Sequence, residues 1–214
     1  MHNRRPYLLF AAATLNALIT LTILSAQPEE SPVSISAEGS APSKPEYTKE
    51  AEAKSNINEV NDFDFFIGSW RVHHRRLKKR LAHNDDWEEF EGTAVAQKIL
   101  GGLGTMDEKV IERPGGAYRT VTFQTYDASK RLWSILWIDS RTPTDLDKPL
   151  IGRFENGIGT FYADDVSQGK PVRPIRVRHL WTNLSTTPHW EQAFSEDGGK
   201  TWETNWTMDF TRTQ

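Results

Sequence analysis

The sequence contains no cysteine. This absence excludes disulfide bonds, thiolate metal sites, lipid-modified cysteine and any cysteine nucleophile. The chain also has no excess of basic residues, because 26 Lys and Arg stand against 29 Asp and Glu, for a formal net charge of −3. Nucleic acid is therefore not an expected partner.

Common catalytic and metal-binding motifs are missing as well. The sequence has no His-Glu-x-x-His and no Gly-x-Ser-x-Gly, and the glycine-rich run 101–104 does not open a helix as a phosphate loop would. His73 and His74 are neighbours on an expected strand, so their side chains point to opposite faces and cannot chelate one ion as a pair. The sequence predicts no metal site and no bound cofactor.

The N-terminal part is predicted to direct export. Arg4 and Arg5 precede an apolar run that ends near Ala26, so residues 1–26 are interpreted as a signal peptide. The run is almost long enough to span a bilayer, which leaves an uncleaved anchor as the alternative. Residues 27–61 are rich in Pro, Ser and charge and are expected to form a disordered tether. The folded part is then periplasmic or extracellular, with membrane contact only through the N-terminal segment.

Residues 62–214 are predicted to form one all-β domain. Short alternating runs follow one another with turn signals between them, and no long helical period interrupts them. The run 132–139 is apolar on both faces, so it is expected to be covered on both sides. The expected strands are 66–79, 87–100, 106–112, 118–126, 132–139, 150–155, 158–163, 175–182, 190–194 and 202–211.

The first and last strands carry matching signatures. Gly68 and Trp70 open the first strand and Arg212 ends the last, which suggests a sheet closed on itself with the guanidinium over the indole. Together with the runs 190–195 and 202–212, these residues resemble a family of uncharacterised bacterial calycin-like (lipocalin-like) domains and, more distantly, nitrobindin-type barrels. The resemblance implies a closed antiparallel barrel of about ten strands with an internal cavity, and it implies no reaction.

A second motif lies at residues 195–202. Its Ser-x-Asp-x-Gly-x-Thr-Trp pattern matches the Asp-box of sialidase propellers, but it occurs once, whereas a propeller repeats it in each blade. We interpret it as the hairpin between the last two strands, in which Asp197 accepts backbone N–H bonds and Trp202 packs beneath the turn.

Strand parity predicts which side chains face the interior. If Trp70 points inward, Val72, His74 and Arg76 follow, and the inward face of the run 175–181 includes His179 and Trp181. Across the last hairpin, the predicted inward residues are Trp190, Gln192, Phe194, Trp202, Thr204, Trp206 and Met208. The predicted outward residues are Glu191, Ala193, Glu203 and Asn205.

The inferred interior is aromatic with a few polar side chains, as in many small-molecule sites. The predicted ligand-binding residues are His74, Arg76, Trp137, His179, Trp181, Gln192 and Trp206. An exported barrel that binds a small, anionic amphipathic ligand is the favoured function, because a buried arginine favours an anion. Three alternatives stay open: an isomerase- or hydrolase-type enzyme with His74 or His179 as general base, a haem-binding barrel, and polar residues that only hydrogen-bond one another. The sequence assigns no oligomeric state.

Overall fold

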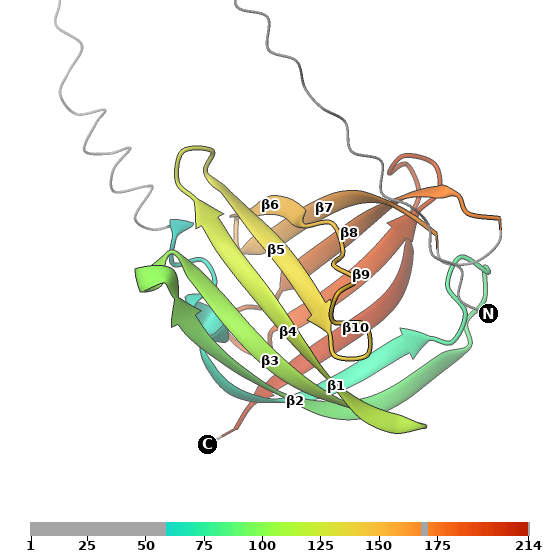
Figure 1. The fold of residues 1–214 in the computed structure, drawn as a ribbon, viewed down its shortest axis with the longest axis horizontal. Helices are drawn as coiled ribbons and strands as arrows, with labels where there is room; N and C mark the ends of the chain where they lie inside the picture. Colours follow the sequence, from blue (N-terminus) through green and yellow to red (C-terminus); the bar gives the residue numbers. More distant parts are fainter. Residues whose placement is uncertain (1–58, 168–170, 214) are drawn as a thin grey trace, which may run out of the picture. The chain divides into compact units, whose positions relative to one another are not determined.

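In the computed structural model, the residues described are 59–167 and 171–213. The predicted signal peptide and all but the last three residues of the predicted tether lie outside this range. In these two ranges, ten strands form a closed antiparallel barrel (Figure 1). The strands are β1 (Gly68–Leu77), β2 (Trp87–Ile99), β3 (Gly104–Arg113), β4 (Gly116–Asp127), β5 (Leu132–Asp139), β6 (Leu150–Glu155), β7 (Ile158–Val166), β8 (Pro174–Thr182), β9 (His189–Ser195) and β10 (Glu203–Arg212). The all-β prediction and its strands are confirmed, with boundaries shifted by a few residues.

Each strand pairs with the next one in sequence, and β1 pairs with β10 to close the ring. The ring order is therefore the chain order, so strands five positions apart face each other across the barrel. By this count β3 lies opposite β8, and β5 lies opposite β10. Two short 3-10 helices, η1 (Asp64–Phe66) and η2 (Leu100–Gly102), complete the described elements. No helix within the described ranges is long and apolar enough to cross a membrane.

Burial alternates along the strands as parity requires. Trp70, Val72 and His74 on β1 are buried, and the arginine between the first two is exposed. On β8 the buried side chains include His179 and Trp181. The inward faces predicted for these two strands are therefore confirmed.

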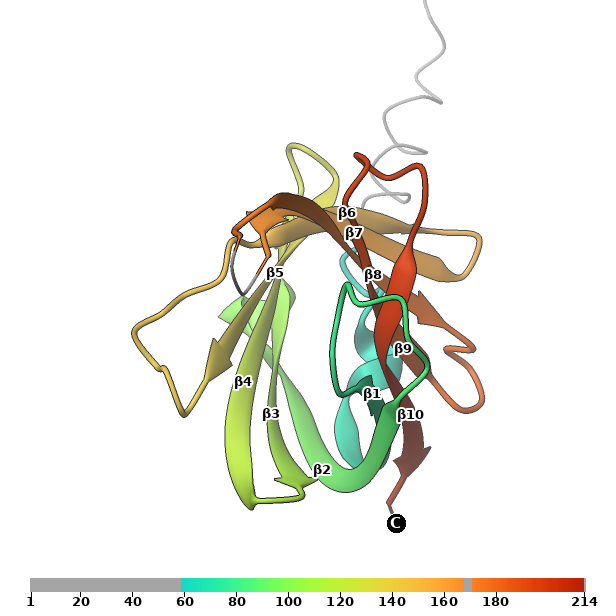
Figure 2. The ribbon, with the colours of Figure 1, turned by 90° about the vertical axis from the view of Figure 1, so that its right-hand side faces the viewer.

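One end of the barrel is plugged by η1 and the phenylalanine before it (Figure 2). Phe63 and Phe66 are fully buried, and the Phe66 ring lies 5.1 Å from that of Trp181. The indole N–H of Trp70 donates to the Phe66 carbonyl at 2.7 Å. Because the plug fills this end with aromatic rings, any internal space must lie towards the other end.

The Gly-x-Trp and C-terminal Arg signatures meet beside the plug. The Arg212 guanidinium lies over the Trp70 ring and donates to the carbonyls of Ile67 (2.8 Å) and Phe65 (2.9 Å). Gly68 has φ +121°, and a Cβ there would lie 2.6 Å from Arg212 Nη1. Glycine is therefore required both for the backbone conformation and for the room that the guanidinium occupies.

The Asp-box forms the hairpin between β9 and β10, as predicted. Asp197 Oδ1 accepts the backbone N–H groups of Lys200 and Thr201, each at 2.9 Å, and Oδ2 accepts the Thr201 hydroxyl at 2.7 Å. The Trp202 indole donates to the Gly199 carbonyl at 3.0 Å. These bonds hold the turn and involve no cavity-lining side chain.

The parity prediction is wrong for the start of β10. The register shifts between Thr204 and Trp206, so that Asn205 forms a bulge. One extra residue reverses the faces before it. Trp202 therefore lies on the outer surface under the Arg178 guanidinium, whereas Asn205, predicted to be outward, is fully buried.

The expectation that β5 is covered on both faces is also wrong. Trp133 and Ile135 are buried inside the barrel, but Leu136 and Ile138 on the other face stay half-exposed. The barrel wall is a single layer here, and no further element of the described ranges packs over it. The uniform apolar run therefore reflects a half-buried outer face and not a second layer.

Candidate functional site

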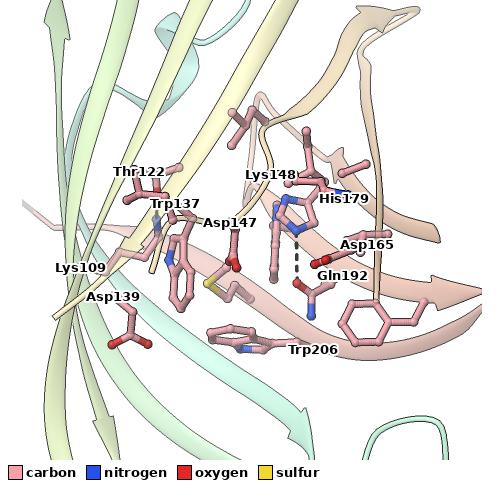
Figure 3. A pocket seen from close by; sticks show the side chains of 18 of the residues that line it. Lys109, Thr122, Trp137, Asp139, Asp147, Lys148, Asp165, His179, Gln192 and Trp206 are labelled. Carbon is pink, nitrogen blue, oxygen red and sulfur yellow. Dashed lines mark hydrogen bonds between the residues drawn. The ribbon is translucent and has the colours of Figure 1, made fainter. Parts of the chain in front are cut away.

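The barrel encloses a cavity of about 850 Å³. Inward side chains of β3 to β10 and Arg76 of β1 form its wall, and Figure 3 shows this interior from close by. At the end away from η1 the cavity reaches Arg80, the loop residues 141–142 and 145–148, and the end of β7. Six of the predicted ligand-binding residues line it: Arg76, Trp137, His179, Trp181, Gln192 and Trp206.

Indole rings supply the apolar part of the wall. Trp137 on β5 and Trp206 on β10 come from strands that face each other across the ring (Figure 3). Trp181 and Trp190 line the cavity from β8 and β9, and the Trp190 and Trp206 rings meet edge to face at 5.8 Å. Such rigid rings offer a large contact area at little entropic cost.

Arg76 is the most distinctive polar side chain of the wall. Its guanidinium lies over the Trp206 ring, with Cζ 4.6 Å from the ring centroid. Burial lowers the pKa of Arg76, which still remains charged at neutral pH. No hydrogen bond or ion pair is made by this guanidinium within the described ranges. A partly desolvated cation with only a ring as partner retains most of its capacity to bind an anion.

Asp139 and Arg141 form a charge pair at the open end. Asp139 accepts from the Arg141 side chain, with Nε to Oδ1 at 3.0 Å, and from the Arg141 backbone N–H at 2.8 Å. The Arg141 guanidinium also lies over the Tyr118 ring, 3.7 Å from its centroid. This pair is a satisfied structural unit, in contrast to Arg76.

Carboxylates also gather at the open end. Burial raises the pKa of Asp147, and the neighbouring charges of Asp165, Asp139 and Asp145 raise it further. The labelled side chains of Figure 3 place Asp147 and Asp165 within this same interior view. The entrance is therefore mixed in charge, and its cationic members include Arg76, Arg80, Arg141 and Lys148.

A polar wall on β3 and β4 was missed by the sequence analysis. Lys109 forms an ion pair with Asp107, and its ammonium also donates to Thr122 at 3.3 Å. Gln124 donates to the other Asp107 oxygen at 2.8 Å and accepts the Thr105 hydroxyl at 2.6 Å. Lys109 is 5% exposed and Asp107 is fully buried, so the pair belongs to the barrel interior.

The signal for this wall was present in the alternation of β3. Thr105, Asp107, Lys109 and Ile111 share one face, and they are all buried. Charged residues are rarely buried unless they are paired, so hydropathy points this face towards solvent. Their i, i+2 spacing on one strand is what allows the ion pair that makes burial tolerable.

A second polar chain crosses the opposite wall. His179 Nε2 lies 3.2 Å from Gln192 Oε1, and Gln192 Nε2 donates to Asn205 Oδ1 at 2.9 Å. With the Gln192 amide so oriented, the proton of the neutral imidazole is on Nε2 and the lone pair is on Nδ1. Burial lowers the pKa of His179 to about 4, so this ring is a weak base at neutral pH.

His74, the seventh predicted residue, does not line the cavity. It is fully buried behind Trp206, whose indole N–H donates to His74 Nδ1 at 3.3 Å, and it stacks on Phe90. Burial, reinforced by the Lys109 charge, lowers the pKa of His74 to about 3. Its role in the structure is to support the Trp206 platform.

The described residues show no group of three or more His, Asp or Glu side chains arranged to hold a metal ion. The two interior histidines also do not fit an axial haem ligand: His74 is outside the cavity, and His179 Nε2 is bonded to Gln192. The chain matches no protein-family model and no curated protein. What it shares with calycin-like barrels is therefore the architecture, a closed antiparallel barrel of ten strands over the described ranges.

Proposed function

We propose that this barrel binds a small anionic amphiphile, with the acidic head group at Arg76 and the apolar part between the indoles. The observation that carries the proposal is the Arg76 guanidinium, which lines an aromatic cavity and has no hydrogen-bond or ion-pair partner in the described part of the chain. Leaving a cation partly desolvated is costly unless an anion offsets the cost. The cavity of about 850 Å³ falls in the usual range for small-molecule sites, roughly 300–1,000 Å³.

The Trp206 ring holds the Arg76 guanidinium in one orientation, so the cation forms a defined binding site. The ring fixes the guanidinium plane from one side, and the cation–π contact holds the side chain at the cavity wall. A carboxylate can then approach the exposed edge of the fork and accept two N–H bonds. Beyond it, Trp137, Trp181 and Trp190 offer an apolar lining for a hydrocarbon or ring system.

The cellular setting is part of the same proposal. Residues 1–26 would direct the chain out of the cytoplasm, and the barrel would work in the periplasm or outside the cell as a calycin-type ligand carrier. The intact mass of the protein recovered from the expressing cells tests the first step. A mass that still includes residues 1–26 would replace the cleaved signal peptide with an anchor.

Ligand binding is tested by a tryptophan fluorescence titration of the full chain. We expect decanoate to quench the emission saturably, because its carboxylate pairs with Arg76 while its chain lies against the indoles. Decanol, which has the same chain without the charge, should bind at least about tenfold more weakly, or ~1.4 kcal/mol. Both ligands are kept below the concentrations at which they aggregate.

Two outcomes would overturn the proposal. Quenching that rises linearly with both compounds would indicate non-specific partitioning. Equal saturable affinities for the acid and the alcohol would show that the cavity takes apolar ligands without using Arg76.

A further inference from the structure

Within the described ranges, the two polar walls of the cavity have more unpartnered hydrogen-bond donors than unpartnered acceptors. The Lys109 ammonium has three N–H groups, and its hydrogen-bond partners within the described ranges are Asp107 and Thr122. Thr122 accepts from Lys109, and its own O–H donates to no side chain of those ranges. Lys109 and Thr122 both line the cavity (Figure 3). This wall therefore offers donors to whatever enters.

The opposite wall also has an unpartnered donor among the described residues. Gln192 accepts from His179 and gives one of its two amide N–H groups to Asn205, which leaves one N–H. In these two walls the acceptors are largely used, since both Asp107 oxygens are bonded and His179 Nδ1 is the acceptor left open among the residues just named. A ligand that is purely hydrocarbon at its inner end would remove water from these donors and replace it with nothing.

The donors of β3 and β4 lie away from Arg76, towards the plug, whereas Gln192 pairs in register with Trp206, whose ring lies under the Arg76 guanidinium. Lys109 Nζ lies 5.8 Å from the centroid of the Phe66 ring, and Phe66 belongs to η1. Arg76 is near the other end of β1, six residues beyond the Trp70 that packs on Phe66. The strand order also puts β3, which carries Lys109, opposite β8. The cavity thus has a cationic pole near its mouth and a donor-rich pole at its floor, with indoles between them.

We propose that the ligand is a two-ended acid: its carboxylate pairs with Arg76, and an oxygen function at its inner end accepts hydrogen bonds from Lys109 or Thr122. The inner group is a hydroxyl, a carbonyl or a second carboxylate. This inference rests on the proposed function and narrows its ligand class from simple fatty acids to ω-oxygenated acids.

The test compares three ligand series in the same fluorescence titration. Saturated acids from octanoate to palmitate are set against their ω-hydroxy counterparts and the corresponding α,ω-diacids. We expect the oxygenated ligands of the best-fitting length to bind at least about fivefold tighter than the plain acid. The length series matters because the preference appears only where the chain spans from Arg76 to the floor.

The decisive variant is Thr122→Val, which removes one hydroxyl and keeps the shape and the Lys109–Asp107 ion pair. It should reduce the preference for oxygenated acids to less than about half its wild-type value while plain-acid affinity is unchanged or higher. Lys109→Met should remove the preference more fully, if the variant folds with Asp107 unpaired. Thr125→Val on the outer face of β4 is the matched control and should change neither affinity.

The outcomes separate this inference from the proposed function. If no acid binds saturably, the proposed function fails. If plain acids bind saturably and more tightly than decanol, but no chain length shows a preference for the ω-oxygen, the proposed function stands and the two-ended ligand is refuted. A preference that Thr122→Val and Lys109→Met both leave intact would also refute it, because the oxygen would then be bound elsewhere.

Discussion

The Arg212 guanidinium lies over the Trp70 indole, with its Cζ 4.2 Å from the ring centroid. The same guanidinium donates to two backbone carbonyls at the end of the plug, those of Phe65 and Ile67. One side chain on the last strand therefore ties together the first strand, the plug and the barrel closure. Its contribution should be to stability and not to ligand binding, because Arg212 does not line the cavity.

We expect Arg212→Ala to lower the free energy of unfolding by roughly 1–3 kcal/mol, from the lost cation–π contact and two hydrogen bonds. Arg71→Ala is the matched control, since Arg71 is exposed on the outer face of the same closing pair of strands. Its effect should stay within about 0.5 kcal/mol. Urea unfolding measures both, and equal shifts would contradict the role assigned to Arg212.

The Asp-box hairpin gives a second stability prediction. Asp197→Ala removes the acceptor of two backbone N–H groups and of the Thr201 hydroxyl, so the melting temperature should fall by several degrees. Decanoate affinity should not change, because the hairpin residues are outside the cavity wall. Asp85→Ala in another exposed turn is the control. Loss of binding with unchanged stability would make the Asp-box a site and the structural interpretation wrong.

Most of the architecture could be predicted because the strands show a two-residue alternation of hydrophobicity and are separated by turn-forming residues. The alternation of β1 and β8 gave their inward faces, and the pair Trp70 and Arg212 gave the closure. The β10 bulge could not be predicted in this way. Asn205 adds one residue without any change in local composition, and the parity of every residue between it and the hairpin then reverses.

The cavity wall likewise contains residues that could be predicted from the sequence and residues that could not. Arg76, Trp137 and Trp206 follow from parity alone and line the cavity. The Lys109–Asp107 pair does not follow from parity, because single-strand hydropathy assigns two charged residues to solvent. Only the closed ring, which turns their face towards the interior, buries both charges and makes their pairing necessary. The depth of His74 behind Trp206 likewise depends on ring packing between β1 and β10, which sequence spacing does not encode.

The two interior histidines predict acid sensitivity. Burial lowers the pKa of His74 to about 3 and that of His179 to about 4, from an ordinary value of 6.5. Between about pH 6.5 and 4 the unfolded chain binds protons that the folded chain does not, so stability falls as the pH falls. Each pKa unit corresponds to about 1.4 kcal/mol, which makes the combined loss several kcal/mol.

Asp62 acts in the opposite direction. Burial raises its pKa to about 6 from 3.8, so the folded form takes up a proton first and gains stability as the pH falls through that window. The two histidines together contribute more to the pH dependence of the free energy of unfolding than this one carboxyl does. The net stability should therefore fall as the pH falls. Urea unfolding over a pH series measures the slope. His179→Gln and His74→Gln should flatten it, whereas His83→Gln at an exposed turn should not. An unchanged slope in both interior variants would show that other groups dominate acid unfolding.

Arg76 should separate stability from function. Arg76→Leu loses a cation–π contact worth roughly 0.5–2 kcal/mol but also removes a partly desolvated charge, so the free energy of unfolding should change by less than about 1 kcal/mol in either direction. Decanoate affinity should nevertheless fall at least about tenfold, or ~1.4 kcal/mol, because the head group loses its cation. Arg76→Lys should lie between wild type and Arg76→Leu, since an ammonium keeps the charge but not the planar fork over Trp206.

The neighbouring Arg75 provides the control for this last prediction. It points to the outer face, where it pairs with Glu89 at 3.1 Å, so Arg75→Leu should leave decanoate affinity unchanged. A residue retained for folding would show the reverse pattern, with a large loss of stability in Arg76→Leu and unchanged binding in whatever fraction remains folded. Side-by-side fluorescence titrations and urea unfolding of the three variants distinguish the two cases, and wild-type affinity in Arg76→Leu would remove Arg76 from the site.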